Sequence, residues 1–275
     1  MNKKNLARKW FTKACQYDRT GSSRNKAIDA YRKSIQYDNR HTDAHVNLGF
    51  IYLAGKDYEK AAKCFHDVVE LEPNNPEALN NLGYVYEKME RFGCAKRAYK
   101  QASGLDPRNV ETMINIAKIQ EAEGNYHDAV KMYNKAIKQE PDNISPRFCL
   151  AVLYDNYDMF DEALEEYKGV LDRDPDYLKA LLNMGYLYVQ LGDNDQAIKL
   201  FKRVITLDPD NADAWNHLGS VNKKPGNYNE AAASFNRLLS LNPFQEETHM
   251  ELTETQYSLY RSKHNGVKNG NQTET

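Results

Sequence analysis

One interval organises this chain: the same residue types return every 34 positions. An alanine recurs at that interval, an aromatic residue stands four positions after each alanine, and a proline follows later in most units. The alanines are Ala27, Ala61, Ala95, Ala129, Ala163, Ala197 and Ala231, the aromatic residues are Tyr31, Phe65, Tyr99, Tyr133, Tyr167, Phe201 and Phe235, and the prolines are Pro73, Pro107, Pro141, Pro175, Pro209 and Pro243. Self-similarity at this period indicates an array of small stacked units, and it argues against one globular core with a catalytic cleft.

Each unit is expected to form two short helices. In residues 42–75, apolar residues recur at helical spacing in two runs that a polar turn separates. Pro73 should end the second helix, because it supplies no amide donor and disfavours helical backbone in the residue before it. Gly49 and Ala61 are small enough for the two helices to approach closely, and Tyr52 and Phe65 should fill the space beside them. One such pair cannot bury its apolar face alone, so the pairs should stack.

The units resemble the tetratricopeptide repeat (TPR) family. Residues 42–75 contain the segments AHVNLGFIY, DYEKAAKCF and ELEPNN, and later units contain ALNNLGYVY (78–86) and LLNMGYLY (181–188). The resemblance covers most of the chain and implies an all-α, right-handed TPR superhelix, an α-solenoid of about seven helix-turn-helix repeats with a C-terminal capping helix.

The repeat pattern also divides the chain. Six good repeats occupy residues 42–75, 76–109, 110–143, 144–177, 178–211 and 212–245. Residues 1–41 form a basic N-terminal segment with a degenerate seventh repeat at roughly residues 8–41. Residues 246–263 are expected to form a polar capping helix, and residues 264–275 a disordered tail. In the last repeat, Pro225 should end the first helix early.

Other features exclude several classes of protein. The four cysteines show no CxxC spacing and lie in expected helices, which favours buried, small apolar residues in a reducing compartment. The sequence has no apolar run long enough to cross a membrane. Its first residues are basic but have no apolar stretch behind them, which argues against a secretory signal and favours a cytoplasmic location.

Motifs of catalysis do not occur either. His41 and His45 are four residues apart, but His41 precedes the expected N-cap, so a metal-binding pair is disfavoured. There is no glycine-rich phosphate loop, nucleophile elbow or HExxH motif. We therefore expect no enzyme activity, no cofactor and no metal.

The resemblance implies a concave groove, lined by the first helix of each pair, in which partners usually bind. One ladder of residues stands there, two positions before the packing glycine or alanine: Asn47, Asn81, Asn115, Cys149, Asn183 and His217. A side-chain amide both donates and accepts, so a row of amides can pair with the main chain of an extended peptide. The row resembles the asparagine ladder of peptide-binding TPR proteins. Asparagine is also common at this position, so a purely structural role is the alternative.

Apolar residues flank this ladder, and we expect about half of them to be partly exposed. They are Val46, Phe50, Leu53, Tyr84, Ile114, Phe148, Val152, Leu182, Tyr186 and Val189. Such a stripe is suited to a short extended or helical segment of a partner protein. The predicted groove residues are Asn47, Phe50, Asn81, Tyr84, Asn115, Lys118, Phe148, Asn183, Tyr186 and His217.

A role as a co-chaperone is disfavoured. TPR domains that capture chaperone tails use a clamp of lysine, arginine and asparagine around a terminal carboxylate. The matching positions here hold Val46, Phe50, Ile114, Glu111 and Asn115, so the basic members are missing.

Charge is unevenly distributed. Residues 1–41 contain eleven basic and three acidic residues, a net charge of +8, and residues 110–177 contain seven basic and fifteen acidic residues, a net charge of −8. On a stiff solenoid such segments would meet between chains. The predicted self-association residues are Lys3, Lys4, Arg8, Lys9, Trp10 and Lys13. Alternatives for the basic end are an acidic membrane surface, nucleic acid (disfavoured, because no binding fold is recognised) or simple solvation.

These observations favour a non-enzymatic scaffold or adaptor that binds peptide segments of partner proteins in its groove. One alternative is a self-assembling scaffold, a head-to-tail homo-oligomer that coats a membrane or organelle surface, similar to the magnetosome scaffold. A second is the regulatory TPR arm of a multi-protein enzyme complex. The adaptor and the self-assembling scaffold differ in one testable property: only the scaffold should form large, salt-sensitive assemblies from the chain alone.

Overall fold

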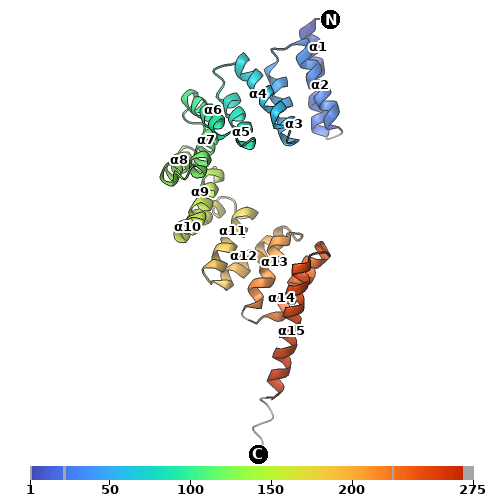
Figure 1. Cartoon of the computed structure of the whole chain (residues 1–275), viewed down its shortest axis with the longest axis vertical. Helices are drawn as coiled ribbons and strands as arrows, with labels where there is room; N and C mark the ends of the chain where they lie inside the picture. Colours follow the sequence, from blue (N-terminus) through green and yellow to red (C-terminus); the bar gives the residue numbers. More distant parts are fainter. Residues whose placement is uncertain (1, 21–22, 225, 269–275) are drawn as a thin grey trace, which may run out of the picture. The chain divides into compact units, whose positions relative to one another are not determined.

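The computed structural model describes residues 2–20, 23–224 and 226–268, and within these residues it contains fifteen α-helices and no strand. The expected all-α class is confirmed. The helices follow one another along the chain in Figure 1, which colours them from blue at the N-terminus to red at the C-terminus. Two compact units make up the chain, Met1–Pro141 and Asp142–Thr275.

The first unit contains four helix pairs, in which each helix packs against the one that follows it. Its helices are α1 (Lys3–Thr20), α2 (Arg24–Tyr37), α3 (Thr42–Ala54), α4 (Tyr58–Leu71), α5 (Pro76–Lys88), α6 (Phe92–Leu105), α7 (Val110–Ala122) and α8 (Tyr126–Gln139). The degenerate repeat predicted near the N-terminus is therefore a real helix pair, and α1 begins five residues earlier than the expected start of that repeat near residue 8.

The second unit contains three helix pairs and a last single helix. Its helices are α9 (Ile144–Asn156), α10 (Phe160–Leu171), α11 (Leu178–Gln190), α12 (Asn194–Leu207), α13 (Ala212–Lys223), α14 (Tyr228–Leu241) and α15 (Glu246–Lys268). The capping helix α15 continues past residue 263, so residues 264–268 of the expected disordered tail are helical. Residues 269–275 lie outside the described residues.

Local sequence signals explain where the helices begin. Asn75 caps α5, since its Oδ1 accepts a hydrogen bond from the backbone N–H of Ala78 at 3.0 Å. Asparagines at the same place in later repeats cap α7, α9 and α13. In the six pairs from α3/α4 to α13/α14, the turn contains one residue in the left-handed region, and these residues are Lys56, Glu90, Gly124, Asp158, Gly192 and Gly226. Both devices repeat with the period of the sequence, which keeps every helix pair in the same register.

The first helix of the last repeat ends early, as Pro225 predicts. Helix α13 ends at Lys223, whereas its counterpart α11 ends at Gln190, the equivalent of Lys224. Pro225 itself lies outside the described residues.

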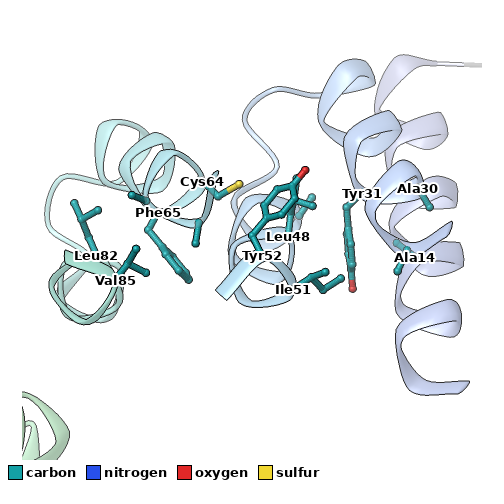
Figure 2. Close-up of a cluster of buried hydrophobic side chains, with 14 residues drawn as sticks. Ala14, Ala30, Tyr31, Leu48, Ile51, Tyr52, Cys64, Phe65, Leu82 and Val85 are labelled. Atoms are coloured by element: carbon teal, nitrogen blue, oxygen red, sulfur yellow. The ribbon is translucent and has the colours of Figure 1, made fainter. Parts of the chain in front are cut away.

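The repeated alanines and aromatic residues form the core. All seven aromatic side chains are at most 1% exposed, and the seven alanines likewise. Figure 2 shows part of this core, with the Tyr31 ring between Ala14 and Ala30 on one side and Ile51 on the other. In the next pair, Phe65 packs against the backbone of Gly49, where an added Cβ would lie 2.9 Å from the ring. Small residue and ring are thus complementary, as the sequence predicts.

Candidate functional site

Two ladder amides bind a tyrosine hydroxyl of the preceding helix pair. In the first unit, Asn47 Nδ2 donates to the Tyr31 hydroxyl at 3.2 Å. In the second unit, Asn183 Nδ2 donates to the Tyr167 hydroxyl at 3.2 Å. Each amide is half-buried and joins its own repeat to the one before it, which is the structural role that the sequence left as an alternative.

Two other ladder residues follow a phenylalanine, which has no hydroxyl to offer. Asn81 stands sixteen residues after Phe65 and is half-buried, and its side chain makes no hydrogen bond within the part of the chain that the structure describes. His217 stands sixteen residues after Phe201, and the two rings stack with centroids 5.6 Å apart. The Tyr186 ring lies 4.4 Å from His217 on another side. Burial lowers the pKa of His217, although Asp213 opposes the effect, so the imidazole is neutral near pH 7.

Asn115 has a third environment, inside the protein. It is 5% exposed, and its Nδ2 donates to Asn80 Oδ1 at 3.1 Å. The Thr112 hydroxyl donates to the same oxygen at 3.2 Å. The predicted place of Asn115 in a peptide-binding surface does not fit this burial. Sequence reasoning missed Asn80, because it stands at the position that Val46 occupies one repeat earlier.

The flanking apolar residues are more exposed than expected. Nine of the ten are partly or well exposed, and only Ile114, at 8%, is buried. In the first unit, Phe50 is 45% exposed, and Lys88 Nζ lies 4.8 Å from the centroid of the half-buried Tyr84 ring. Lys118 is exposed on α7. The first unit therefore carries an apolar, partly open face on α3 and α5.

The second unit carries similar residues on its own first helices. Phe148 is half-buried on α9, with the Tyr167 and Tyr177 rings 6.1 Å and 5.3 Å away. Cys149, in the ladder position of α9, is also half-buried. Burial raises the pKa of Tyr186 to about 12, so this phenol remains a hydrogen-bond donor at any physiological pH.

The predicted self-association residues lie on α1. The five cations among them, Lys3, Lys4, Arg8, Lys9 and Lys13, are all exposed. Trp10 is half-buried and packs against the core, with the ammonium groups of Lys13 and Lys33 at 5.1 Å and 4.2 Å from its ring. The tryptophan therefore packs into the fold and also contacts the Lys13 ammonium, whereas all five cations remain exposed to solvent.

The two histidines considered as metal ligands have separate partners. His45 is buried, with Nε2 3.1 Å from the Asn39 carbonyl oxygen and Nδ1 3.4 Å from Asp67 Oδ2. His41 stacks on Phe11, with ring centroids 4.7 Å apart.

Of the four cysteines, only Cys64 is fully buried, and burial raises the pKa of its thiol to about 12. Cys15, Cys94 and Cys149 are half-buried, so the expected burial holds for one residue and in part for the others. In the part of the chain that the structure describes, every helix is too short or too polar to cross a membrane.

Family models agree with this geometry. A tetratricopeptide repeat model matches residues 86–148, 121–181 and 157–220, a TPR repeat model matches residues 51–90, and a further tetratricopeptide repeat model matches residues 212–245. The chain belongs to the tetratricopeptide repeat family. TPR proteins typically mediate protein–protein interactions, and the fold is generally non-enzymatic.

Solved structures of TPR proteins are similar in fold. A tetratricopeptide repeat protein from Parabacteroides merdae is 16% identical with a TM-score of 0.67, over 92% of this chain and 99% of that one. PilF of Pseudomonas aeruginosa is 18% identical with a TM-score of 0.62, over 78% and 97%. Yeast Tom70 is 18% identical with a TM-score of 0.66, over 95% and 55%. At these identities the likeness shows the fold alone. No curated protein sequence matches the chain.

Proposed function

We propose that this TPR protein is a non-catalytic adaptor that binds peptide segments of partner proteins on the first helices of its repeats. The observation that carries the proposal is the apolar stripe on the first helices within each unit; of the ten residues in the two stripes, nine stay partly exposed. Folded proteins seldom leave such a stripe without a partner.

In the first unit, the proposed site combines Phe50, Asn81 and Tyr84. The Asn81 amide can donate to and accept from the main chain of a bound peptide, because the fold does not use it. Phe50 and Tyr84 supply apolar surface for peptide side chains. Aromatic anchors beside a hydrogen-bonding group are typical of peptide recognition.

In the second unit, the proposed site consists of Phe148 on α9, Tyr186 on α11 and His217 on α13. Asn183 is less available, since Tyr167 already binds its amide. The neutral His217 ring can donate one hydrogen bond and accept another, and its tautomer decides which nitrogen does which.

A change in the core should test the role of Asn81 without altering the exposed surface. Phe65→Tyr places a hydroxyl where Tyr31 and Tyr167 have theirs, so it should bind the Asn81 amide as those residues bind Asn47 and Asn183. Peptides selected from a display library on the wild-type chain should bind this variant about 2- to 12-fold more weakly, the value of one hydrogen bond.

Surface variants complete the test. Phe50→Ser and Tyr84→Ala should weaken the binding of the same peptides further. Lys131→Ala changes an exposed residue on α8, the second helix of its pair, and should not affect peptide binding. Circular dichroism melting should be similar for these three surface variants. If all of them bind the selected peptides as the wild-type chain does, this face is not the binding site and the proposal fails.

The charge distribution favours a second candidate, self-association. The exposed cations of α1 would meet the acidic residues of another molecule, and residues 142–177 contain ten acidic and three basic residues. A head-to-tail contact of this kind need not close and can form large assemblies. Lys3, Lys4, Arg8 and Lys9 changed together to Glu should abolish salt-sensitive light scattering by the full chain. A monodisperse wild-type monomer at low salt would refute this candidate.

A further inference from the structure

A recurring notch lies between the second helix of one repeat and the turn of the next. In residues 42–75, the Tyr52 side chain lines this notch. Its ring lies between two charged groups, the Arg32 guanidinium at 6.0 Å and the Lys60 ammonium at 5.5 Å from the centroid. The same position carries Tyr86, Tyr154 and Tyr188 in other repeats.

Two of the six repeats depart from this pattern, because Gln120 and Asn222 stand where the other four have tyrosine. Beside Gln120 is a cavity of about 290 Å³, lined also by Lys100 and Asp128. These two residues are the equivalents of Arg32 and Lys60, between which the Tyr52 ring lies. The cavity therefore occupies the place that a phenol ring fills at Tyr52.

The chemistry of the cavity points to a ligand. The Gln120 Oε1 atom is buried and has no hydrogen-bond partner in the part of the chain that the structure describes. Two neighbouring donors are occupied: the Tyr99 hydroxyl binds Glu87 at 3.1 Å, and Lys96 Nζ binds Glu123 at 2.7 Å. An unpaired buried acceptor is unfavourable, so a donor that reaches it from outside gains a full hydrogen bond.

The remaining walls are suited to an aromatic ring. Ile116 and Ile119 line the cavity together with the buried Tyr99 ring. An engineered apolar cavity of about 150 Å³ is large enough to hold benzene. The space beside Gln120 is thus wide enough for one substituted ring.

We propose that this cavity binds a phenol group, supplied by a tyrosine side chain of a partner polypeptide. The ring would lie against Ile116, Ile119 and Tyr99, and the hydroxyl would donate to Gln120 Oε1. The partner would thereby supply the tyrosine that this repeat lacks. The site lies between α6, α7 and α8 of the first unit, so it is separate from the apolar stripe on α3 and α5 and does not depend on the proposed function.

Fluorine NMR on the full chain can test this proposal with three probes: 4-fluorophenol, fluorobenzene and N-acetyl-3-fluorotyrosine amide. We expect 4-fluorophenol to bind about 2- to 12-fold more tightly than fluorobenzene, because of its hydroxyl. The tyrosine amide should bind as well, which identifies a side chain on a polypeptide as the source. If 4-fluorophenol binds and the tyrosine amide does not, the site takes free phenols and the proposed source is wrong.

Two variants of Gln120 distinguish the contribution of the cavity to binding from that of the hydrogen-bond acceptor. Gln120→Tyr fills the space as other repeats do, so it should fold with an unchanged circular dichroism spectrum and bind none of the probes. Gln120→Met keeps the side-chain length and removes the acceptor, so the preference for the phenol over fluorobenzene should disappear. Equal binding of 4-fluorophenol by the wild-type chain and Gln120→Tyr, or a preference that survives in Gln120→Met, would overturn the proposal.

Discussion

The close approach of α5 and α6 leads to a prediction about Gly83. This glycine lies in α5 against the fully buried Tyr99 ring of α6. A Cβ added at Gly83 would lie 2.6 Å from Cε1 and 2.7 Å from Cδ1 of that ring. Carbon atoms pack at about 3.5–4.0 Å, so Gly83→Ala must displace the ring or separate the helices.

The size of the effect follows from two opposing terms. Overpacking of a core costs about 1–3 kcal/mol, and replacing glycine by alanine within a helix gains about 0.5–1 kcal/mol. Ala117 and Ala151 stand at the equivalent positions of two other repeats and are fully buried, so the helix pair can adapt to a methyl group. The overpacking cost should therefore lie in the lower half of its range, about 1–2 kcal/mol.

Gly104 offers a matched control in the same repeat. It lies in the last turn of α6, and an added Cβ would have no atom within 4 Å. Gly104→Ala should be neutral or stabilising by up to about 1 kcal/mol. At about 2–4 °C per kcal/mol, Gly83→Ala should melt about 2–8 °C below Gly104→Ala. Equal melting temperatures by circular dichroism would refute the argument that glycine is needed for close packing.

Three further changes test other contacts. Arg147→Ala should cost about 2–4 kcal/mol in urea unfolding, because it leaves the largely buried Glu166 carboxylate, now 2.6 Å from Arg147 Nη1, without its partner. Changing both residues to Met should restore most of that loss, and equal losses in the two variants would contradict the reasoning. Burial lowers the pKa of His217, so the unfolded chain takes up the proton first and stability should fall as the pH drops below about 6.5. His217→Asn should lose this part of the pH dependence of the melting temperature, and an identical pH profile would exclude His217 as its source. Asn80→Ala and Asn115→Ala should each cost about 1–3 kcal/mol in urea unfolding, and the double variant clearly less than their sum, since one hydrogen bond joins the two residues. Full additivity would show that the two amides do not interact.

The fold was predictable because its signals are local and periodic. A packing alanine and an aromatic residue mark each of the seven helix pairs, and a proline follows six of them. Each of these residues acts within its own repeat or on the next. The exceptions lie at the ends, where no neighbouring repeat sets the pattern: α1 begins early, and α15 continues to Lys268.

The polar environment of the ladder was harder to predict, because it depends on a residue in another repeat. Asn47 and Asn81 occupy the same position, but one follows Tyr31 and the other Phe65, so only Asn47 has a hydroxyl to bind. The choice between tyrosine and phenylalanine is visible in the sequence. The consequence of this choice for the ladder becomes apparent only in the structure, which shows that the ring reaches the next repeat. Asn115 is less predictable still, because its partner Asn80 stands at a position where only one other of the six repeats, with Asn216, has an asparagine.

The division into two compact units gives each unit its own intrinsic fluorophore. The chain contains two tryptophans: Trp10 in the first unit, beside the Lys33 ammonium, and Trp215 in the second, whose indole N–H donates to the Pro209 carbonyl at 2.9 Å. Both rings are half-buried, so their emission should shift when the surrounding helices separate. A chain with Trp10→Phe then reports on the second unit alone, and one with Trp215→Phe on the first. Denaturation followed by emission therefore shows directly whether the array melts in one step or in two.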